Sequence, residues 1–195
     1  LTGLVWDGQK RLRDLLPRGF GAAAAPAPAR AAGADPYDGW TEAQIDGELT
    51  REMGRRWMIQ AVWRALRPGC KADVALVVFG GQGVGKSTGF HTLVGSDWFS
   101  DNDLPIGQDD VRVSQNLREA WVHELAELTD VRRADVNKLK AFVTRREEIY
   151  TPKYGRKAVN EPRRCVFVGT TNERHFLKDA TGERRWWPVQ GGRVD

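Results

Sequence analysis

The sequence predicts an α/β fold built on a largely parallel central sheet. The first observation is the apolar, β-rich run DVALVVF, residues 73–79, of the kind that forms a strand buried on both faces. The second is its direct continuation into a glycine-rich turn and a helix. The third is that two later apolar runs, in residues 120–128 and 164–172, end in polar side chains, as strands do at the ligand-binding edge of such a sheet.

The part of the chain before this strand divides into three segments. Residues 1–18 should form an N-terminal helical segment, and residues 19–40 an Ala/Pro-rich linker or insertion with too little bulk to pack a core. A longer helix should begin after Thr41, which can cap it, and stop at Pro68 and Gly69. Its apolar residues recur every three or four positions and predict its core-facing side: Ile45, Leu49, Met53, Ile59, Val62, Trp63 and Leu66.

The stretch VFGGQGVGKSTGF, residues 78–90, fits the phosphate-binding pattern G-x-x-x-x-G-K-[ST]. A strand, a glycine-rich turn and a helix starting at Lys86 direct backbone N–H groups and the helix amino end at phosphate oxygens. Lys86 would neutralise the β- and γ-phosphates, and Ser87 would offer a hydroxyl to Mg²⁺. Residues 41–195 are therefore expected to form a P-loop ATPase core that binds ATP and Mg²⁺ through nine residues: Gly80, Gly81, Gln82, Gly83, Val84, Gly85, Lys86, Ser87 and Thr88.

Two acidic residues are the candidates for the chemistry of hydrolysis. In AWVHELAEL, residues 120–128, a short strand through His123 leads to Glu124, and Glu127 follows three residues later. Hydrolysis needs an acid for the metal and a group that positions water, normally at the end of a neighbouring strand. We therefore assign Glu124, with Ser87, to the metal and Glu127 to the attacking water. His123 should point to the opposite side of the sheet and receives no role.

A third strand is predicted in RCVFVGTTN, residues 164–172, which ends in three small polar residues. The amide of Asn172 can hydrogen-bond the γ-phosphate or the attacking water without adding charge, which suits sensing of the terminal phosphate. A turn-capping asparagine is the alternative interpretation.

Positive charge is concentrated in residues 132–164, where eleven Lys or Arg against four Asp or Glu give +7, in a chain whose total is +4. A helix holding Val136, Leu139, Phe142 and Val143 should come first. It should precede a weakly alternating stretch that contains Pro152 and Gly155 and predicts a hairpin. Its tip would offer cations to phosphates and an aromatic face to a base: Arg145, Lys153, Tyr154, Arg156 and Lys157. The segment favours a polyanion partner, and a solvated loop with incidental charge is the alternative.

Seven motifs occur along the chain in this order: WDGQKRL, PGCKAD, GGQGVGKST, WVHELAEL, LKAF, YGRKAVNEPRRCVFVGTTN and TGERRWWPV. In combination they resemble the virulence-associated E family, ATPases of phages and mobile elements that are similar to superfamily 3 helicases of the AAA+ group. The resemblance covers nearly the whole chain outside the Ala/Pro stretch. It implies a three-layer α/β/α core of the AAA+ type, a homo-oligomeric ring with a hexamer favoured, and action on DNA during replication of the element.

The resemblance also implies roles for two further segments. In the resembled helicases the hairpin before the sensor strand enters the channel of the ring and tracks single-stranded DNA. An arginine of one subunit also reaches the γ-phosphate of its neighbour, and Arg184 and Arg185 in TGERRWWPV are the candidates. Trp186 and Trp187 should anchor a strand in the core. Residues 19–36 depart from the family as an insertion, and primase and carboxyl-terminal helical parts are missing, so we expect a piece of a longer protein.

The sequence therefore predicts an ATP-hydrolysing, helicase- or translocase-like motor domain. A nucleotide-gated DNA-binding initiator or scaffold is the first alternative, and a P-loop kinase, for which no second substrate motif is visible, is the second. Cys70 and Cys165 have neither metal-ligand nor redox spacing, which indicates a reducing compartment. No apolar run approaches the roughly 18 residues of a membrane span. We expect a cytoplasmic protein of bacterial or phage origin.

Overall fold

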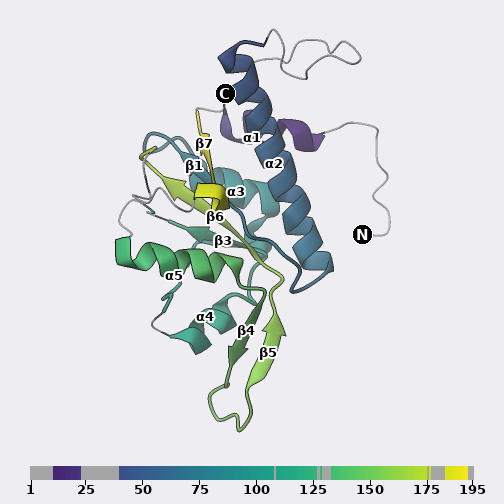
Figure 1. Cartoon of the computed structure of the whole chain (residues 1–195), viewed down its shortest axis with the longest axis vertical. Coiled ribbons are helices and arrows are strands. Elements are labelled where there is room, and N and C mark those ends of the chain that lie inside the picture. The colour runs from purple at the N-terminus through teal and green to yellow at the C-terminus, as the bar shows by residue number, and fades with distance from the viewer. Residues whose placement is uncertain are drawn as a thin grey trace.

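The computed structural model describes residues 11–22, 40–107, 109–126, 128, 133–174, 176 and 183–192. Figure 1 shows how the elements are arranged along the chain. The helices are η1 (Arg11–Asp14), α1 (Leu15–Phe20), α2 (Glu42–Leu66), α3 (Lys86–Val94), η2 (Ser96–Trp98), α4 (Asp110–Asn116), α5 (Arg133–Thr144) and η4 (Glu183–Arg185). The strands are β1 (Ala75–Phe79), β2 (Phe99–Ser100), β3 (Val122–Leu125), β4 (Glu147–Tyr150), β5 (Val159–Pro162), β6 (Val166–Thr171) and β7 (Trp186–Gln190).

The central sheet has five strands in the order β2-β3-β6-β1-β7. Every neighbouring pair is parallel, with Val78 opposite Thr170 between β1 and β6 and Glu124 opposite Val168 between β3 and β6. β6 therefore lies between β1 and β3, although it follows both in the chain. Because all strands point the same way, the carboxyl ends of β1, β3 and β6 meet at one edge. This confirms the predicted α/β class and the largely parallel sheet.

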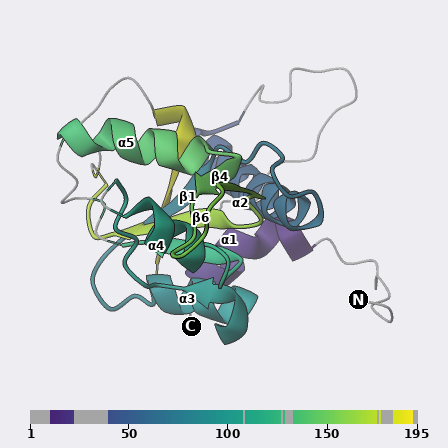
Figure 2. The same cartoon turned by 90° about the horizontal axis from the view of Figure 1, so that it is seen from below.

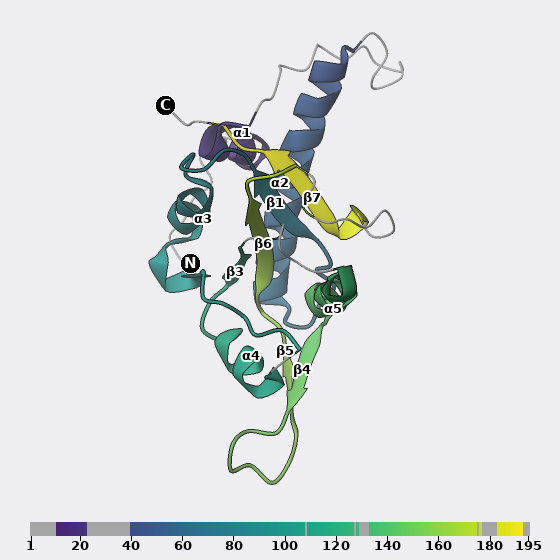
Figure 3. The same ribbon diagram turned by 90° about the vertical axis from the view of Figure 1, so that its left-hand side faces the viewer.

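Helices cover both faces of the sheet, because the strands present apolar side chains to both sides in alternation. One core cluster joins α1, α2 and α3 to the sheet through side chains that include Leu16, Trp57 and Phe90. The other cluster joins α4 and α5 to the opposite face through side chains that include Val113 and Phe142. Figures 2 and 3 show α3 and α5 on opposite sides of β1 and β6. The architecture is three layers, with the sheet in the middle.

The predicted helix after Thr41 is confirmed as α2, but its predicted inner face is wrong. The Thr41 side chain accepts a hydrogen bond from the Gln44 backbone N–H, and the Gln44 side chain accepts one from the Thr41 backbone N–H, forming a capping box. Most of the apolar residues predicted to face the core are exposed: Ile45, Leu49, Ile59, Val62, Trp63 and Leu66. Although α2 is 25 residues long, neither it nor any other helix in the described ranges is long and apolar enough to cross a bilayer.

Close packing at a glycine and hydrogen bonds of two large side chains, rather than the apolar stripe, decide which side of α2 is buried. A Cβ on Gly54 would lie 2.7 Å from the Leu16 Cγ, so α1 can pack closely against α2 at this glycine. On the same side, the Trp57 indole N–H donates to the Phe167 carbonyl oxygen at 3.2 Å, and the fully buried Arg64 donates to the Arg145 carbonyl oxygen at 2.6 Å. Close packing and specific hydrogen bonds thus override the apolar periodicity.

The N-terminal helical segment extends beyond its predicted end and belongs to the main core. α1 continues to Phe20, whose ring centroid lies 4.6 Å from that of Phe90, and whose carbonyl oxygen accepts a hydrogen bond from the Gly192 N–H at 2.9 Å. Pro17 is tolerated because it lies in the first turn of α1, where its missing N–H is not needed. Gly19 and Phe20 are therefore helical, and residues 23–39 of the predicted linker lie outside the described residues.

The predicted hairpin is confirmed as the antiparallel pair β4 and β5, with Glu147 opposite Pro162 and Tyr150 opposite Val159. It follows α5, whose predicted apolar side is buried through Val136, Leu139, Phe142 and Val143. The hairpin projects away from the central sheet (Figures 1 and 3). Since β5 leads directly into β6, the hairpin extends from the amino-terminal end of that strand.

Candidate active site

The glycine-rich loop connects the end of β1 to the start of α3. Gly83 and Gly85 have φ values of 80° and 82°, in the left-handed region that favours glycine, and Gly85 is the N-cap of α3. A Cβ on Gly80 would lie 2.8 Å from the Gly191 carbonyl oxygen, so this glycine lets the loop pass close to the end of β7. The loop presents the amino end of α3 to solvent, where backbone N–H groups and the helix dipole favour an anion.

Lys86, the first residue of α3, is held by its own loop and by the end of β6. Its Nζ donates to the carbonyl oxygens of Gly80 and Gly81 and to Oδ1 of Asn172, each at 2.9 Å. An ammonium group has three N–H bonds, so these acceptors use all of them. Burial lowers the pKa of Lys86, and the nearby charge of Glu124 partly opposes this shift. A phosphate that binds Lys86 must therefore replace at least one of these acceptors.

The carboxylate of Glu124 lies beside the first turn of α3. Its Oε1 accepts a 2.7 Å hydrogen bond from the Ser87 hydroxyl and another from the Thr170 hydroxyl. Its Oε2 is buried and has no hydrogen-bond partner among the described residues. Hydroxyl and carboxylate oxygens are ligands that Mg²⁺ accepts, with phosphates and water completing the coordination. The side chains at this position therefore fit the predicted metal.

Four predicted residues are thus brought together from three separate parts of the chain: Lys86, Ser87, Glu124 and Asn172. The parallel sheet is the reason, because it places the ends of β1, β3 and β6 at one edge. Sequence reasoning missed Thr170, whose hydroxyl completes the contacts of Glu124. The position of Thr170 two residues before Asn172 could have predicted that it faces the site, because residues two apart lie on the same side of a strand.

The opposite side of β3 is part of the core. His123 is fully buried, its ring centroid lies 6.3 Å from that of Phe167, and burial lowers its pKa to about 4, so it is neutral at pH 7. This confirms that His123 points away from the site. Glu127 lies outside the described residues, and its role stays a prediction. Its neighbour Leu128 packs on β6, since a Cβ on Gly169 would lie 2.6 Å from the Leu128 Cδ1.

Arg184 and Arg185 lie at the other edge of the sheet. They are in η4, directly before β7, and the first residue of β7, Trp186, is opposite Ala75, the first residue of β1. The glycine-rich loop follows the other end of β1, about 13 Å away at the rise of a β-strand. The register therefore separates both arginines from the loop of their own chain. Trp186 is buried and Trp187 is partly buried against the core, which confirms their predicted packing.

The tip of the hairpin is exposed and basic. Tyr154 is 93% exposed, and the Lys153 Nζ lies 5.6 Å from its ring centroid. None of the described ion pairs includes Lys153, Arg156 or Lys157, and all three side chains are exposed. Arg145 was also predicted at the tip, and this placement is wrong. It lies before β4, at the base of the hairpin, with Nη1 3.4 Å from Glu148 Oε2.

Other cations of the basic segment have a structural role at the hairpin base. Arg163 is buried, donates to the Phe142 carbonyl oxygen at 2.5 Å, and pairs with the buried Glu148. Its backbone N–H donates to the Arg146 carbonyl oxygen at 2.9 Å, and its own carbonyl oxygen accepts from the Gly69 N–H at 2.9 Å. These bonds join the base of the hairpin to α5 and to the turn after α2. The net charge of the segment therefore overstates what is available to a partner.

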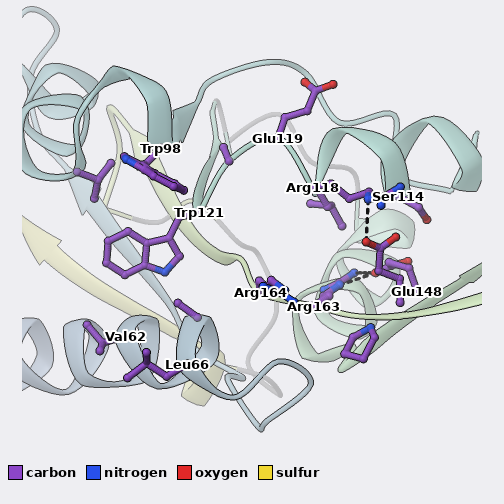
Figure 4. Close-up of a pocket in the computed structure, with 16 residues that line it drawn as sticks. Val62, Leu66, Trp98, Ser114, Arg118, Glu119, Trp121, Glu148, Arg163 and Arg164 are labelled. Atoms are coloured by element: carbon purple, nitrogen blue, oxygen red, sulfur yellow. Dashed lines mark hydrogen bonds and ion pairs between the residues drawn. The ribbon is translucent and has the colours of Figure 1, made fainter. Parts of the chain in front are cut away.

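A groove of about 980 Å³ lies beside the hairpin base. Its apolar part is formed by Val62, Leu66, Trp98 and Trp121, and ion pairs that include Arg163 with Glu148 lie at its other end (Figure 4). The loop residues 80–88, Glu124 and Asn172 are not among its lining residues. The groove is therefore separate from the candidate active site.

The same arrangement of elements occurs in solved structures. A structure described as the apo structure of the NrS-1 C-terminal region aligns with 97% of this chain and 40% of its own length, with a TM-score of 0.55 and 16% sequence identity. A second structure of this region, described as its A form, aligns with 73% of this chain and 35% of its own, with a TM-score of 0.50 and 22% identity. At these identities the likeness concerns the fold, and this chain spans less than half of either structure.

Comparison by sequence identifies the family. A search of curated proteins finds no match. The family described as the virulence-associated protein E-like domain matches residues 1–195, the whole of the chain. That match agrees with the resemblance carried by the seven sequence motifs. The chain belongs to the virulence-associated protein E-like domain family.

Proposed function

We propose that this chain is a P-loop NTPase domain that binds ATP with Mg²⁺ and couples its hydrolysis to movement on single-stranded DNA, in the replication of a phage or mobile element. The observation that carries the proposal is the meeting of Lys86, Ser87 and Glu124 at the carboxyl edge of a parallel sheet. A cation, a hydroxyl and a carboxylate beside a helix amino end form the group of side chains that nucleotide hydrolysis requires.

Each side chain has a distinct part in this chemistry. The Lys86 ammonium exchanges its loop carbonyl acceptors for the β- and γ-phosphate oxygens of ATP. Ser87 and Glu124 would hold Mg²⁺, and the bound ion would neutralise negative charge on the phosphates. Asn172, released from Lys86, is free to bind the γ-phosphate or the attacking water. Glu127 orients that water, as its position three residues after Glu124 suggests.

The hairpin supplies the DNA contact in this proposal. Its tip carries Lys153, Arg156 and Lys157 as exposed cations beside the exposed ring of Tyr154. Exposed cations bind phosphates without reading bases, and an aromatic ring stacks on any base, which suits a motor that moves along a strand of any sequence.

The position of Arg184 and Arg185 is compatible with the proposed ring of subunits. The register keeps both away from the loop of their own chain, which supports the proposal that an arginine finger from this pair acts on a neighbouring chain. Mixing subunits that lack Lys86 with subunits that lack the finger should restore some hydrolysis, because an intact loop then meets an intact finger. Mixed oligomers that remain as inactive as both parents would place the arginines outside catalysis.

The decisive experiment measures ATP hydrolysis with and without single-stranded DNA. Stimulation by DNA supports the motor. DNA binding that depends on nucleotide, without stimulated hydrolysis, supports an initiator or scaffold instead. Phosphorylation of an added nucleotide or nucleoside supports a kinase. A chain that fails to bind ATP would contradict the assignment of the site itself.

A further inference from the structure

The hydroxyl of Thr170 joins two neighbouring strands within the candidate active site. Thr170 is on β6, is 7% exposed, and donates to the Oε1 atom of Glu124 on β3. A buried hydroxyl is unfavourable unless it is hydrogen-bonded, so this bond is the physical reason for a threonine at a buried strand position. Val168, two residues earlier on the same side of β6, is apolar and belongs to the core.

The hydrogen bonds of Glu124 are divided unequally between its two oxygens. Oε1 accepts from both Ser87 and Thr170, whereas Oε2 is buried without a partner among the described residues. Two donors on one oxygen, one from α3 and one from β6, oppose rotation of the carboxylate. The arrangement leaves Oε2 as the oxygen available to a cation or to water bound to that cation.

We propose that Thr170 is a positioning residue, which orients the Glu124 carboxylate so that Oε2 is presented to the Mg²⁺ of the nucleotide complex. The inference rests on the proposed function and deepens it. Without the Thr170 hydroxyl, Ser87 alone restrains Oε1, and the carboxylate rotates more freely. Metal affinity then falls and hydrolysis slows, while the affinity for nucleotide without metal, carried by the loop and Lys86, is kept.

Two substitutions at this position separate the hydroxyl from the shape of the side chain. Thr170→Val keeps the branched shape and removes the hydroxyl, whereas Thr170→Ser keeps the hydroxyl and removes the methyl group. Thr171→Val is the matched control, because Thr171 is also buried, carries the next hydroxyl along β6, and has its side chain on the other side of the strand. Thermal unfolding followed by circular dichroism checks that each variant folds.

Mn²⁺ serves as the probe, titrated into the protein saturated with a non-hydrolysable ATP analogue and followed by its electron paramagnetic resonance signal. Loss of an outer-shell partner typically weakens metal binding by 10- to 100-fold. Since Ser87 remains, we expect Thr170→Val to weaken Mn²⁺ binding by about tenfold. Thr170→Ser and Thr171→Val should stay within about twofold of the wild type, and analogue affinity measured in EDTA should be unchanged in all three.

Two results would overturn the inference. Mn²⁺ affinity of folded Thr170→Val within about twofold of the wild type would show that the hydroxyl does not orient the carboxylate. Thr170→Ser as weak as Thr170→Val would show that the methyl group, and hence packing, matters instead. The proposed function can fail separately. If the wild type binds Mn²⁺ and the analogue but does not hydrolyse ATP, the Mn²⁺ affinities of the Thr170 variants can still be compared. A wild type that binds no analogue contradicts both.

Discussion

The polar side chains near the two ends of β6 differ in whether they bind one another. At the carboxyl end, Thr170 donates to Glu124 and Asn172 accepts from Lys86, so side chains of the site already hold one another. At the amino end, the strand continues from a hairpin whose tip carries Lys153 and Lys157 outside all the described ion pairs. Paired groups are pre-oriented for one small ligand, whereas unpaired cations suit a flexible polymer that slides. The same strand thus joins a group of side chains that hydrogen-bond one another to an exposed, basic hairpin.

If the two ends of β6 act separately, a substitution at one end should abolish its activity and leave the other activity intact. Lys86→Ala should have the largest effect. Removing the cation proposed to bind the phosphates should lower ATP hydrolysis by at least about 100-fold, a transition-state loss of about 2.7 kcal/mol. DNA binding without nucleotide should not change, because the hairpin is untouched. A steady-state ATPase assay measures the loss, with Lys71→Ala, which removes an exposed lysine beside Asp73, as the matched control. Normal turnover by Lys86→Ala would contradict the site assignment.

Two carboxamide variants separate the roles proposed for Glu124 and Glu127. Glu127→Gln should keep ATP and Mg²⁺ affinity but lower hydrolysis by about 100-fold, because an amide holds water without favouring its deprotonation. Glu124→Gln should also lower the affinity for Mg²⁺, because it removes the negative charge proposed to bind the ion. ATP hydrolysis measured across Mg²⁺ concentrations separates the two effects. If Glu127→Gln hydrolyses ATP normally while Glu124→Gln does not, the roles are reversed.

At the amino end, the double change Lys153→Ala with Lys157→Ala should weaken binding of single-stranded DNA for every sequence. Two lost phosphate contacts should reduce the slope of log affinity against log salt concentration by about 1.4. Fluorescence anisotropy over a range of salt concentrations provides the measurement. Nucleotide affinity should stay unchanged. An unaltered slope would place the DNA site elsewhere.

The smallest expected effect concerns Tyr154, the one residue other than glycine with a positive φ, 73°, in the described ranges. Such a conformation is unfavourable for tyrosine by about 1 kcal/mol, and asparagine tolerates it better. Tyr154→Asn should therefore raise Tm by about 1–2 °C, which corresponds to about 0.5 kcal/mol. It should weaken DNA binding about fivefold through lost stacking. Tyr154→Phe, which keeps the ring, should change neither quantity, and unchanged DNA binding in Tyr154→Asn would exclude stacking by this ring.

Local patterns predicted the elements well. The strand before Gly80, the start of a helix at Lys86 and the capped start of α2 at Thr41 all lie where the sequence placed them. Each depends on neighbours within a few residues: apolar runs for strands, glycines for positive φ, and a side-chain oxygen for the helix cap. The same reasoning missed α4 (Asp110–Asn116), a seven-residue helix.

Features that depend on contacts between residues distant in the sequence were predicted less accurately. The apolar stripe of α2 predicted the wrong buried face, because Gly54 admits α1 and the Trp57 indole reaches a carbonyl of β6. The placement of Arg145 at the hairpin tip was wrong because strand pairing begins only at Glu147. In both cases long-range packing or pairing, which no local periodicity contains, decided the outcome.

The amino-acid sequence by itself determined the glycine-rich loop between β1 and α3, because glycine conformations, the start of the helix and a buried strand are set within about a dozen consecutive residues. It also determined that the chain carries a strongly basic segment. Only the tertiary structure decided that β6 lies between β1 and β3, and therefore that Thr170 reaches Glu124 while Arg184 and Arg185 lie at the opposite edge. The physical reason is that strand order and register depend on how the two faces of the sheet are packed by helices distant in sequence.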